Sequence, residues 1–134
     1  MAGGLPNGCR GPGRRGRERR AGGLVIRGAV YRIDLGQARG HEQRGRRLGV
    51  VVSPSRSPLT VVTVVPTSTS AGRAIHRPEM ELAGRRTVLL VDQIRSIDVD
   101  FVSDDPVDFL TREQLTELEG ALAHYLGIHE LWGV

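Results

Sequence analysis

Two stretches of the sequence hold the side chains best suited to chemistry on a phosphate. Residues 40–47 read GHEQRGRR and bring a histidine, a carboxylate, an amide and three arginines together. Residues 66–70 read PTSTS and place four hydroxyl side chains in a row after a valine-rich run. Arginine donates paired hydrogen bonds to phosphate oxygens, and hydroxyls and carboxylates bind ribose hydroxyls. Together the two stretches indicate a phosphate-binding site, whereas each alone is also typical of a solvated loop or a turn.

The sequence contains no motif for the other common kinds of functional site. There is no CxxC or HExxH spacing for a metal, and no G-x-x-x-x-G-K-[ST] or G-x-G-x-x-G loop for a nucleotide. The histidines are scattered, and no serine is singled out as a nucleophile. We therefore expect neither a metal nor a cofactor.

The charge is polarised along the chain. All 19 basic residues are arginine: residues 1–23 hold six of them and one glutamate, and residues 24–95 hold twelve with five acids. Residues 96–134 hold one arginine and nine acids. This distribution predicts a surface for a polyanion on one side only.

The length of 134 residues favours a single domain. Residues 1–23 are rich in glycine and arginine and nearly free of apolar side chains, so we expect a disordered tail and one folded domain over 24–134. The tail is either an arm that contacts nucleic acid or a dispensable leader.

No apolar run reaches the roughly 20 residues that span a bilayer. The lone Cys9 excludes a disulfide framework and favours the reducing cytoplasm.

The elements that must hold these side chains are mostly short strands. Residues 36–47 and the two prolines in 54–58 predict a loop and a turn, and residues 83–86 a second turn. β-branched and alternating runs predict a half-buried strand at 28–35, an edge strand at 79–82, and further strands at 49–53, 59–66, 87–91 and 94–99.

Residues 111–126 predict a C-terminal helix instead. Thr111 and Gln114 form a capping-box pair, and Gly127 follows as a C-terminal cap. The fold class expected is mainly β with α, a small curled antiparallel barrel closed by one helix. The apolar face of the helix consists of Leu115, Leu118, Leu122, Tyr125 and Leu126.

The motifs in order, IRGAVYRIDL, GHEQRGRRLGVVVSP, TVVTVVPTSTS and LLVDQIRSID, resemble the MazF/PemK/Kid family of toxin endoribonucleases over about residues 26–126. The resemblance implies an SH3-like curled sheet and a homodimer that cuts single-stranded RNA without metal. The 2′-hydroxyl would attack the adjacent phosphate, leaving 2′,3′-cyclic phosphate and 5′-hydroxyl ends. A cognate antitoxin would silence the enzyme by laying an acidic tail across the RNA groove.

The resemblance also assigns residues. The catalytic arginine of the family falls on Arg47, with its neighbouring glutamate on Glu42, and the position of its catalytic threonine holds Ser68. Strand alternation would turn Thr67 and Thr69 to the face opposite Ser68. The proline usual after the arginine is replaced by Leu48. Residues expected to contact RNA are His41, Gln43, Arg44, Arg46, Thr67, Thr69 and Gln93.

Elementary chemistry limits the roles. Arg47 can stabilise a phosphorane but is a poor base, because a free arginine side chain keeps its proton far above neutral pH. Glu42 is a better base, and His41 has a suitable unperturbed pKa of about 6.5. Two alternatives remain: a gyrase-poisoning toxin resembling CcdB, which needs no such constellation, and an SH3-like module that only binds nucleic acid or protein.

Overall fold

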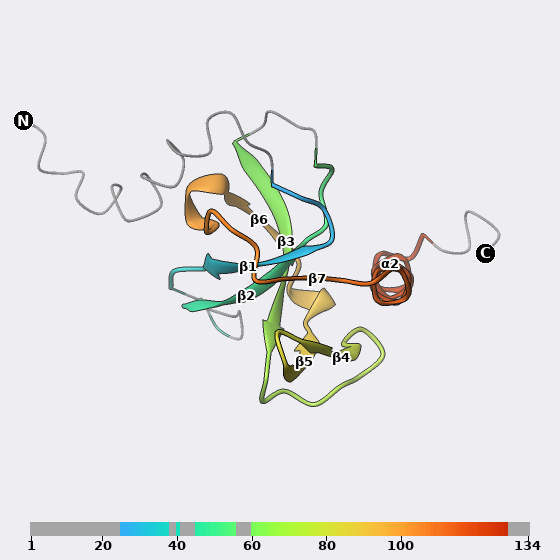
Figure 1. The fold of residues 1–134 in the computed structure, drawn as a ribbon. Coiled ribbons are helices and arrows are strands. Elements are labelled where there is room, and N and C mark those ends of the chain that lie inside the picture. Colours follow the sequence, from blue (N-terminus) through green and yellow to red (C-terminus); the bar gives the residue numbers. More distant parts are fainter. Residues whose placement is uncertain (1–24, 38–39, 41–44, 56–59, 129–134) are drawn as a thin grey trace, which may run out of the picture.

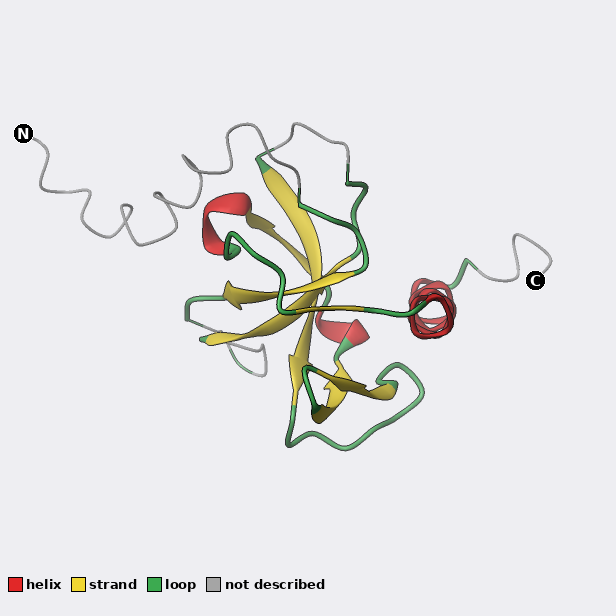
Figure 2. Ribbon diagram, in the orientation of Figure 1, coloured by secondary structure: helices red, strands yellow, loops and turns green. Residues whose placement is uncertain are grey.

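The computed structural model describes residues 25–37, 40, 45–55 and 60–128. The predicted tail over 1–23 lies outside this part. Antiparallel strands dominate, and a single α-helix in the described chain follows them (Figures 1 and 2). The elements are β1 (Ala29–Asp34), β2 (Arg46–Val51), β3 (Val61–Ser68), β4 (Glu79–Leu82), β5 (Arg85–Leu89), η2 (Val91–Gln93), β6 (Arg95–Asp98), η3 (Val99–Phe101), β7 (Asp108–Phe109) and α2 (Arg112–Leu126).

Strand β3 organises the sheet, whose order is β4-β5-β3-β2-β1-β7 with β6 also paired to β3. The first part of β3 pairs with β2 and β6, and its last two residues, Thr67 and Ser68, pair with β5. A bridge between Ile33 and Val102 joins the chain after β6 back to β1. The ring β1-β2-β3-β6 is thereby nearly closed into the small barrel that the sequence predicts.

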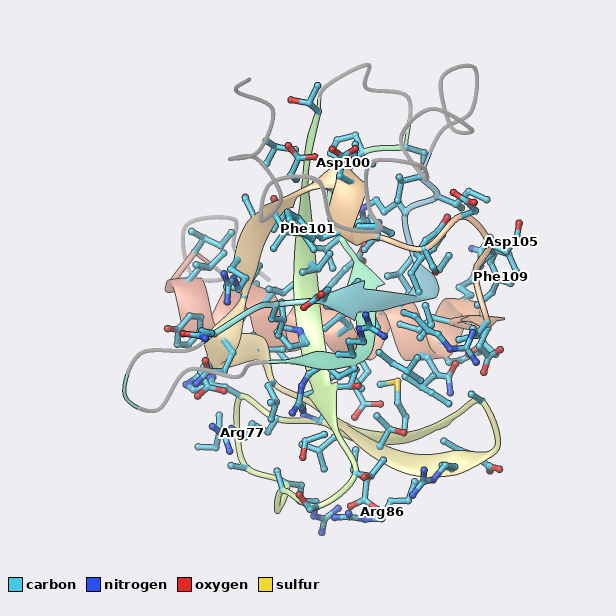
Figure 3. The ribbon with its side chains drawn as sticks, turned by 90° about the vertical axis from the view of Figure 1, so that its left-hand side faces the viewer. Arg77, Arg86, Asp100, Phe101, Asp105 and Phe109 are labelled. Carbon is cyan, nitrogen blue, oxygen red and sulfur yellow. The ribbon has the colours of Figure 1, made fainter. Side chains whose placement is uncertain are left out.

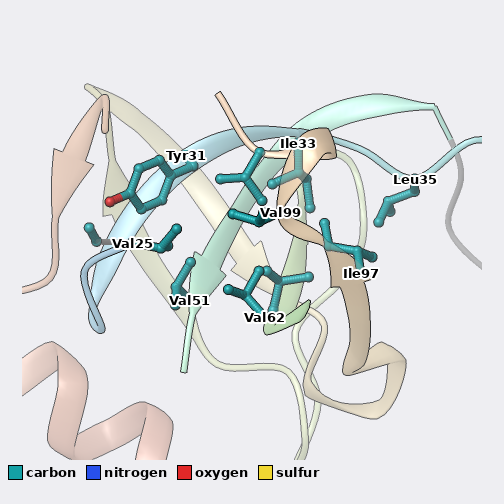
Figure 4. Close-up of a cluster of buried hydrophobic side chains, with 11 residues drawn as sticks. Val25, Tyr31, Ile33, Leu35, Val51, Val62, Ile97 and Val99 are labelled. Atoms are coloured by element: carbon teal, nitrogen blue, oxygen red, sulfur yellow. The ribbon is translucent and has the colours of Figure 1, made fainter. Parts of the chain in front are cut away.

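The interior of this barrel is a core of aliphatic side chains around one tyrosine (Figure 4). Alternate residues of β1, including Tyr31 and Ile33, point into it because side chains on a strand alternate between faces. The Tyr31 hydroxyl accepts a hydrogen bond from the Ile26 amide at 2.9 Å, which compensates for burying it. The remaining members are Val25, Ala29, Leu35, Val51, Val62, Val64, Ile97, Val99 and Val102.

A second core covers the outer face of the same strands. Val30, Val50 and Val65 pack there against the β4–β5 hairpin, η2 and Leu118 of α2. The expectation that residues 28–35 form a half-buried strand is confirmed for the second half of β1, where Arg32 is exposed and Asp34 is half-buried on the outer face. At Val30 the same face is buried, because the hairpin and the helix cover it there.

The helix is confirmed with its caps. The Thr111 side chain accepts from the Gln114 amide, Gln114 returns a bond to the Thr111 amide, and Gly127 adopts the left-handed conformation at φ 72°. The predicted apolar face is only partly correct. Leu118 is fully buried, but Tyr125 and Leu126 are 41% and 55% exposed, because the last turn runs past the core.

Three strand boundaries differ from the sequence expectation. β2 begins at Arg46, inside the predicted loop; β3 continues through Pro66 to Ser68; and β5 begins at Arg85, inside the predicted turn. Each extension follows from a neighbouring strand. Asp34 lies opposite Arg46, Leu82 lies opposite Arg85, and the Pro66 carbonyl accepts from the Leu90 amide at 2.8 Å. Pairing partners override weak local preferences at such positions.

The charge polarity is visible in space. Arg77 and Arg86 lie toward one end of the molecule, and Asp100 and Asp105 toward the other (Figure 3). Within the described chain, no helix is both long and apolar enough to cross a bilayer.

Candidate functional site

A pocket of about 330 Å³ opens where β2 and the end of β3 meet the β4–β5 hairpin. One wall comes from β2 and β3 and the other from the hairpin, which lies beside the end of β3 in Figure 1. The pocket is lined by three arginines and by four side chains that carry a hydroxyl group, and no carboxylate is among its lining residues. These residues are Arg46, Arg47, Leu48, Thr67, Ser68, Thr69, Leu82, Ala83, Arg85 and Thr87.

The side chain of Arg47 reaches from β2 to β3. It lies opposite Ile33 of β1, and its Nη1 donates to the Thr67 carbonyl at 2.8 Å. Gly49 lets β1 and β2 approach, because a Cβ at that position would lie 2.5 Å from Ile33 Cδ1. Position 49 therefore helps to set the strand that carries Arg47.

The hydroxyl cluster lies beside this guanidinium. Thr67 and Ser68 are 4% and 9% exposed, whereas Thr69 is exposed. The Thr67 hydroxyl donates to the Leu48 carbonyl at 2.8 Å and so ties β3 to β2. Because all three residues line the pocket, strand alternation alone does not select one of them.

Hydrogen bonding restricts what Ser68 can do. Its Oγ accepts from the amides of Ser70 and Ala71 at 3.1 and 3.0 Å, and Ser70 Oγ lies 3.4 Å away. A hydroxyl has two acceptor lone pairs and one donor hydrogen. With both lone pairs directed at backbone amides, Ser68 is suited to donate a hydrogen bond and unsuited to accept a proton as a base.

The hairpin wall is the part of the site that sequence reasoning missed. Leu82, Ala83, Arg85 and Thr87 all line the pocket, yet they were expected only in an edge strand, a turn and a further buried strand. Arg85 and Thr87 share one face of β5 by alternation. The adjacent Arg86 instead binds Glu79 at 2.5 Å. The sequence places a threonine two residues after an arginine, and this spacing was the available signal for a polar face of the strand. Only the fold, however, brings that face of β5 to β3.

The loop between β1 and β2 is described only at its base. The Leu35 amide donates to the Gly45 carbonyl, and the Gly45 amide donates to the Gly36 carbonyl, at 2.9 and 2.8 Å. Both glycines have positive φ, which a side chain would disfavour. The predicted site residues His41, Glu42, Gln43 and Arg44 lie outside the described residues.

Gln93 is not among the residues that line the pocket. It lies in η2, which packs against α2. Beside it, Arg77 binds Asp92 through two contacts of 2.9 Å. The hydrogen bond from Arg77 lowers the pKa of the Asp92 carboxyl, and partial burial opposes that shift. This ion pair belongs to the seam between η2 and α2 and not to the pocket.

The pocket is thus equipped to bind a polyanion and to stabilise added negative charge. Arg47 supplies a planar fork that fits phosphate oxygens, and Ser68 supplies a neutral donor beside it. Arg46 and Arg85 are exposed on the rim and add positive potential.

Several known proteins are similar to this chain in sequence or in fold. Rv3098A of Mycobacterium tuberculosis, named as a candidate toxin, is 60% identical over 106 residues, covering 78% of this chain and 100% of that protein. Endoribonuclease MazF9 of the same organism is 32% identical over 122 residues, covering 81% and 99%. A solved mycobacterial endoribonuclease in complex with its cognate antitoxin has the same fold, with a TM-score of 0.65 at 24% identity and coverage of 78% and 96%.

The family match spans the folded part of the chain. Residues 26–126 match the family described as PemK-like, MazF-like toxin of type II toxin-antitoxin system. That range begins before β1 and ends at the last residue of α2, so it includes the barrel, the hairpin and every described residue of the pocket. The chain therefore belongs to the PemK-like, MazF-like toxin family of type II toxin–antitoxin systems.

Proposed function

We propose that this protein is a metal-independent endoribonuclease toxin that cleaves single-stranded RNA at selected sequences. The observation that carries the proposal is the pocket in which the Arg47 guanidinium lies beside the hydroxyls of residues 67–69. Relatives named as endoribonucleases, such as MazF9, support the assignment of RNA as the substrate.

The proposed reaction is attack of a ribose 2′-hydroxyl on the adjacent phosphorus. Glu42 accepts the proton of the 2′-hydroxyl, a bond forms between the 2′-oxygen and phosphorus, and the bond to the 5′-oxygen breaks. The departing 5′-oxygen takes up a proton, which leaves a 2′,3′-cyclic phosphate and a 5′-hydroxyl end. His41 is the alternative base on the same loop.

Arg47 stabilises the charge that builds on the phosphorane in this scheme. A guanidinium fork can bind two of its oxygens at once, so the protein itself supplies the positive charge that a metal supplies in other nucleases. Ser68 donates one further hydrogen bond, in keeping with its two accepted amide bonds. His41, Gln43, Arg44, Arg46, Thr67, Thr69 and Gln93 remain proposed contacts to the RNA.

The proposed partners follow from the same surface. The arginine-rich rim attracts an acidic antitoxin tail, and the mycobacterial relative was solved with its cognate antitoxin. We also propose a homodimer in the cytoplasm. Exposed apolar side chains such as Phe101 and Phe109, 43% and 53% exposed, offer surface for assembly.

The decisive experiment incubates the purified protein with single-stranded RNA in EDTA and maps the new ends. Cleavage that leaves cyclic phosphate and 5′-hydroxyl ends supports the proposal. Cleavage that requires added metal contradicts metal independence. Absence of cleavage together with inhibition of DNA gyrase would favour the CcdB-like alternative, and RNA binding without cleavage would favour a binding module.

A further inference from the structure

The hairpin wall of the pocket carries an arginine with no role in the scheme above. Arg85 begins β5, is exposed and lines the pocket. Among the residues that the structure describes, it has no carboxylate partner, whereas the neighbouring Arg86 binds Glu79. Strand alternation turns these two arginines to opposite faces of β5. Of these two arginines, only Arg85 therefore presents its charge to a ligand in the pocket.

The turn that delivers Arg85 is held from outside the hairpin. Ala83 and Gly84 connect β4 to β5 with φ of 52° and 79°. Positive φ at both central residues is the geometry of a tight hairpin turn, and alanine adopts it at a cost. The Ala83 amide donates to Asp108 Oδ2 at 2.7 Å, and Asp108 Oδ1 accepts from the Phe109 amide at 2.8 Å. Both carboxylate oxygens are thus used by backbone amides.

A second contact reinforces this clamp. Gln114 Nε2 lies 3.4 Å from the Glu81 carbonyl, while its Oε1 accepts from the Thr111 amide in the capping box. β7 is itself fixed, because Asp108 pairs with Val30 of β1. The hairpin wall is consequently attached to the barrel through β7 and the start of α2.

We propose that Arg85 binds the phosphate next to the scissile phosphate, and that Asp108 is a positioning residue that holds the turn carrying it. The inference rests on the proposed function for the identity of the polyanion. Arg47 lies on the β2–β3 wall and Arg85 on the hairpin wall, so one RNA strand in the pocket can present a different anion to each guanidinium. The next anion along an RNA chain is the neighbouring phosphodiester.

Binding tests this inference without requiring cleavage. The probe is a fluorescent single-stranded RNA of mixed sequence with 2′-O-methyl groups, which remove the nucleophile. Its affinity is measured for the full chain between about 50 and about 200 mM salt. Arg85→Ala is expected to weaken binding about tenfold at low salt and to reduce the salt slope by about 0.7, the value for one phosphate contact on a single strand. The matched control, Arg86→Ala, keeps the wild-type slope.

Cleavage kinetics separate Arg85 from the catalytic centre. On an oligonucleotide that contains the mapped site, Arg85→Ala raises KM about tenfold and leaves kcat within about twofold. A dinucleotide has no second phosphate, so on that substrate Arg85→Ala and the wild type cleave alike.

The role of Asp108 is tested through Arg85. Asp108→Ala is expected to raise KM on the long substrate, and the double variant with Arg85→Ala raises it no further than Arg85→Ala does. Asp108→Asn, which retains an acceptor oxygen, restores part of the loss. A purely structural role would lower the melting temperature and leave KM unchanged, which contradicts positioning.

The outcomes distinguish this inference from the proposed function. Equal salt slopes for Arg85→Ala, Arg86→Ala and wild type overturn the inference even if the wild type cleaves RNA. A reduced slope for Arg85→Ala alone, in a protein that cleaves no RNA, supports Arg85 as a phosphate contact and overturns the proposed function.

Discussion

Two regions of the molecule use arginine in opposite ways. In the pocket, Arg47 donates to a backbone carbonyl and Arg85 has no carboxylate partner in the described chain. In the seam between η2 and α2, Arg77 is neutralised by Asp92 through two bonds. The neighbouring His76 ring lies 5.1 Å, centroid to centroid, from the rings of His124 and Tyr125 of α2.

The difference shows which arginines serve a ligand and which serve the fold. An arginine that already binds a carboxylate adds little to the attraction of a polyanion, because the pair is nearly neutral from outside. An arginine without a carboxylate partner, as Arg85 is among the described residues, keeps its full charge. The abundance of arginine in this sequence therefore overstates the phosphate-binding surface, and the partner of each guanidinium is the better guide.

The largest expected effect is on catalysis at Arg47. Arg47→Ala should lower the cleavage rate by about 10²–10³, because it removes a stabiliser of phosphorane charge. Arg77→Ala is the matched control from the seam and should cleave near the wild-type rate. The rates are measured on labelled RNA in EDTA, with circular dichroism to check folding. Wild-type cleavage by a folded Arg47→Ala protein would remove Arg47 from the mechanism.

Ser68 should rank next. Ser68→Ala should lower the rate about tenfold to a hundredfold, because it removes a donor to the phosphate as well as the acceptor for two amides. Ser68→Thr keeps the hydroxyl and should retain most of the activity. Thr67→Ala and Thr69→Ala are compared in the same single-turnover assay. Full activity in Ser68→Ala with loss in either neighbour would assign the catalytic hydroxyl to that neighbour.

The seam should respond in stability rather than in activity. Asp92→Asn removes a half-buried, two-bond ion pair and should cost about 1 kcal/mol of unfolding free energy at neutral pH. The hydrogen bond from Arg77 lowers the pKa of Asp92 in the folded state. The contribution of the ion pair to stability is therefore complete above the unfolded pKa of about 3.9, and it is lost as the pH falls through the lower pKa of the folded state. Urea unfolding of both proteins checks this, since their difference should vanish toward low pH. A difference that persists at low pH would show that the asparagine perturbs packing instead.

The smallest effect is expected from residues 1–23. If pocket arginines supply the specific contacts, deletion of this segment leaves the cleavage sites unchanged and weakens RNA affinity only a few-fold, most visibly at low salt. End mapping and anisotropy on the truncated protein provide the two readouts. Altered sites would mean that the segment takes part in recognition.

The sequence anticipated the helix better than the strand ends, and the reason is local. Thr111, Gln114 and Gly127 satisfy backbone groups within one turn of themselves, so their pattern is complete in the sequence. Arg46, Ser68 and Arg85 became strand residues only because a partner strand lies beside them. Tyr125 fitted the apolar face by spacing alone, but its ring packs on His76 and not in the core, and it stays 41% exposed.

The amino-acid sequence by itself determined the element types, the polarity of charge, the family resemblance and the presence of Arg47 and Ser68 in motifs of the right order. These features depend on composition, short-range periodicity and spacing. Only the tertiary structure decided that, on the edge of β3 opposite β2, pairing passes from β6 to β5 near Pro66, which brings the β4–β5 hairpin to the hydroxyl cluster. It likewise decided that Arg85 enters the pocket while Arg86 pairs with Glu79. The physical reason is that pairing partners and facing walls come from residues distant in sequence, and a chain that is read locally holds no record of which of them will meet.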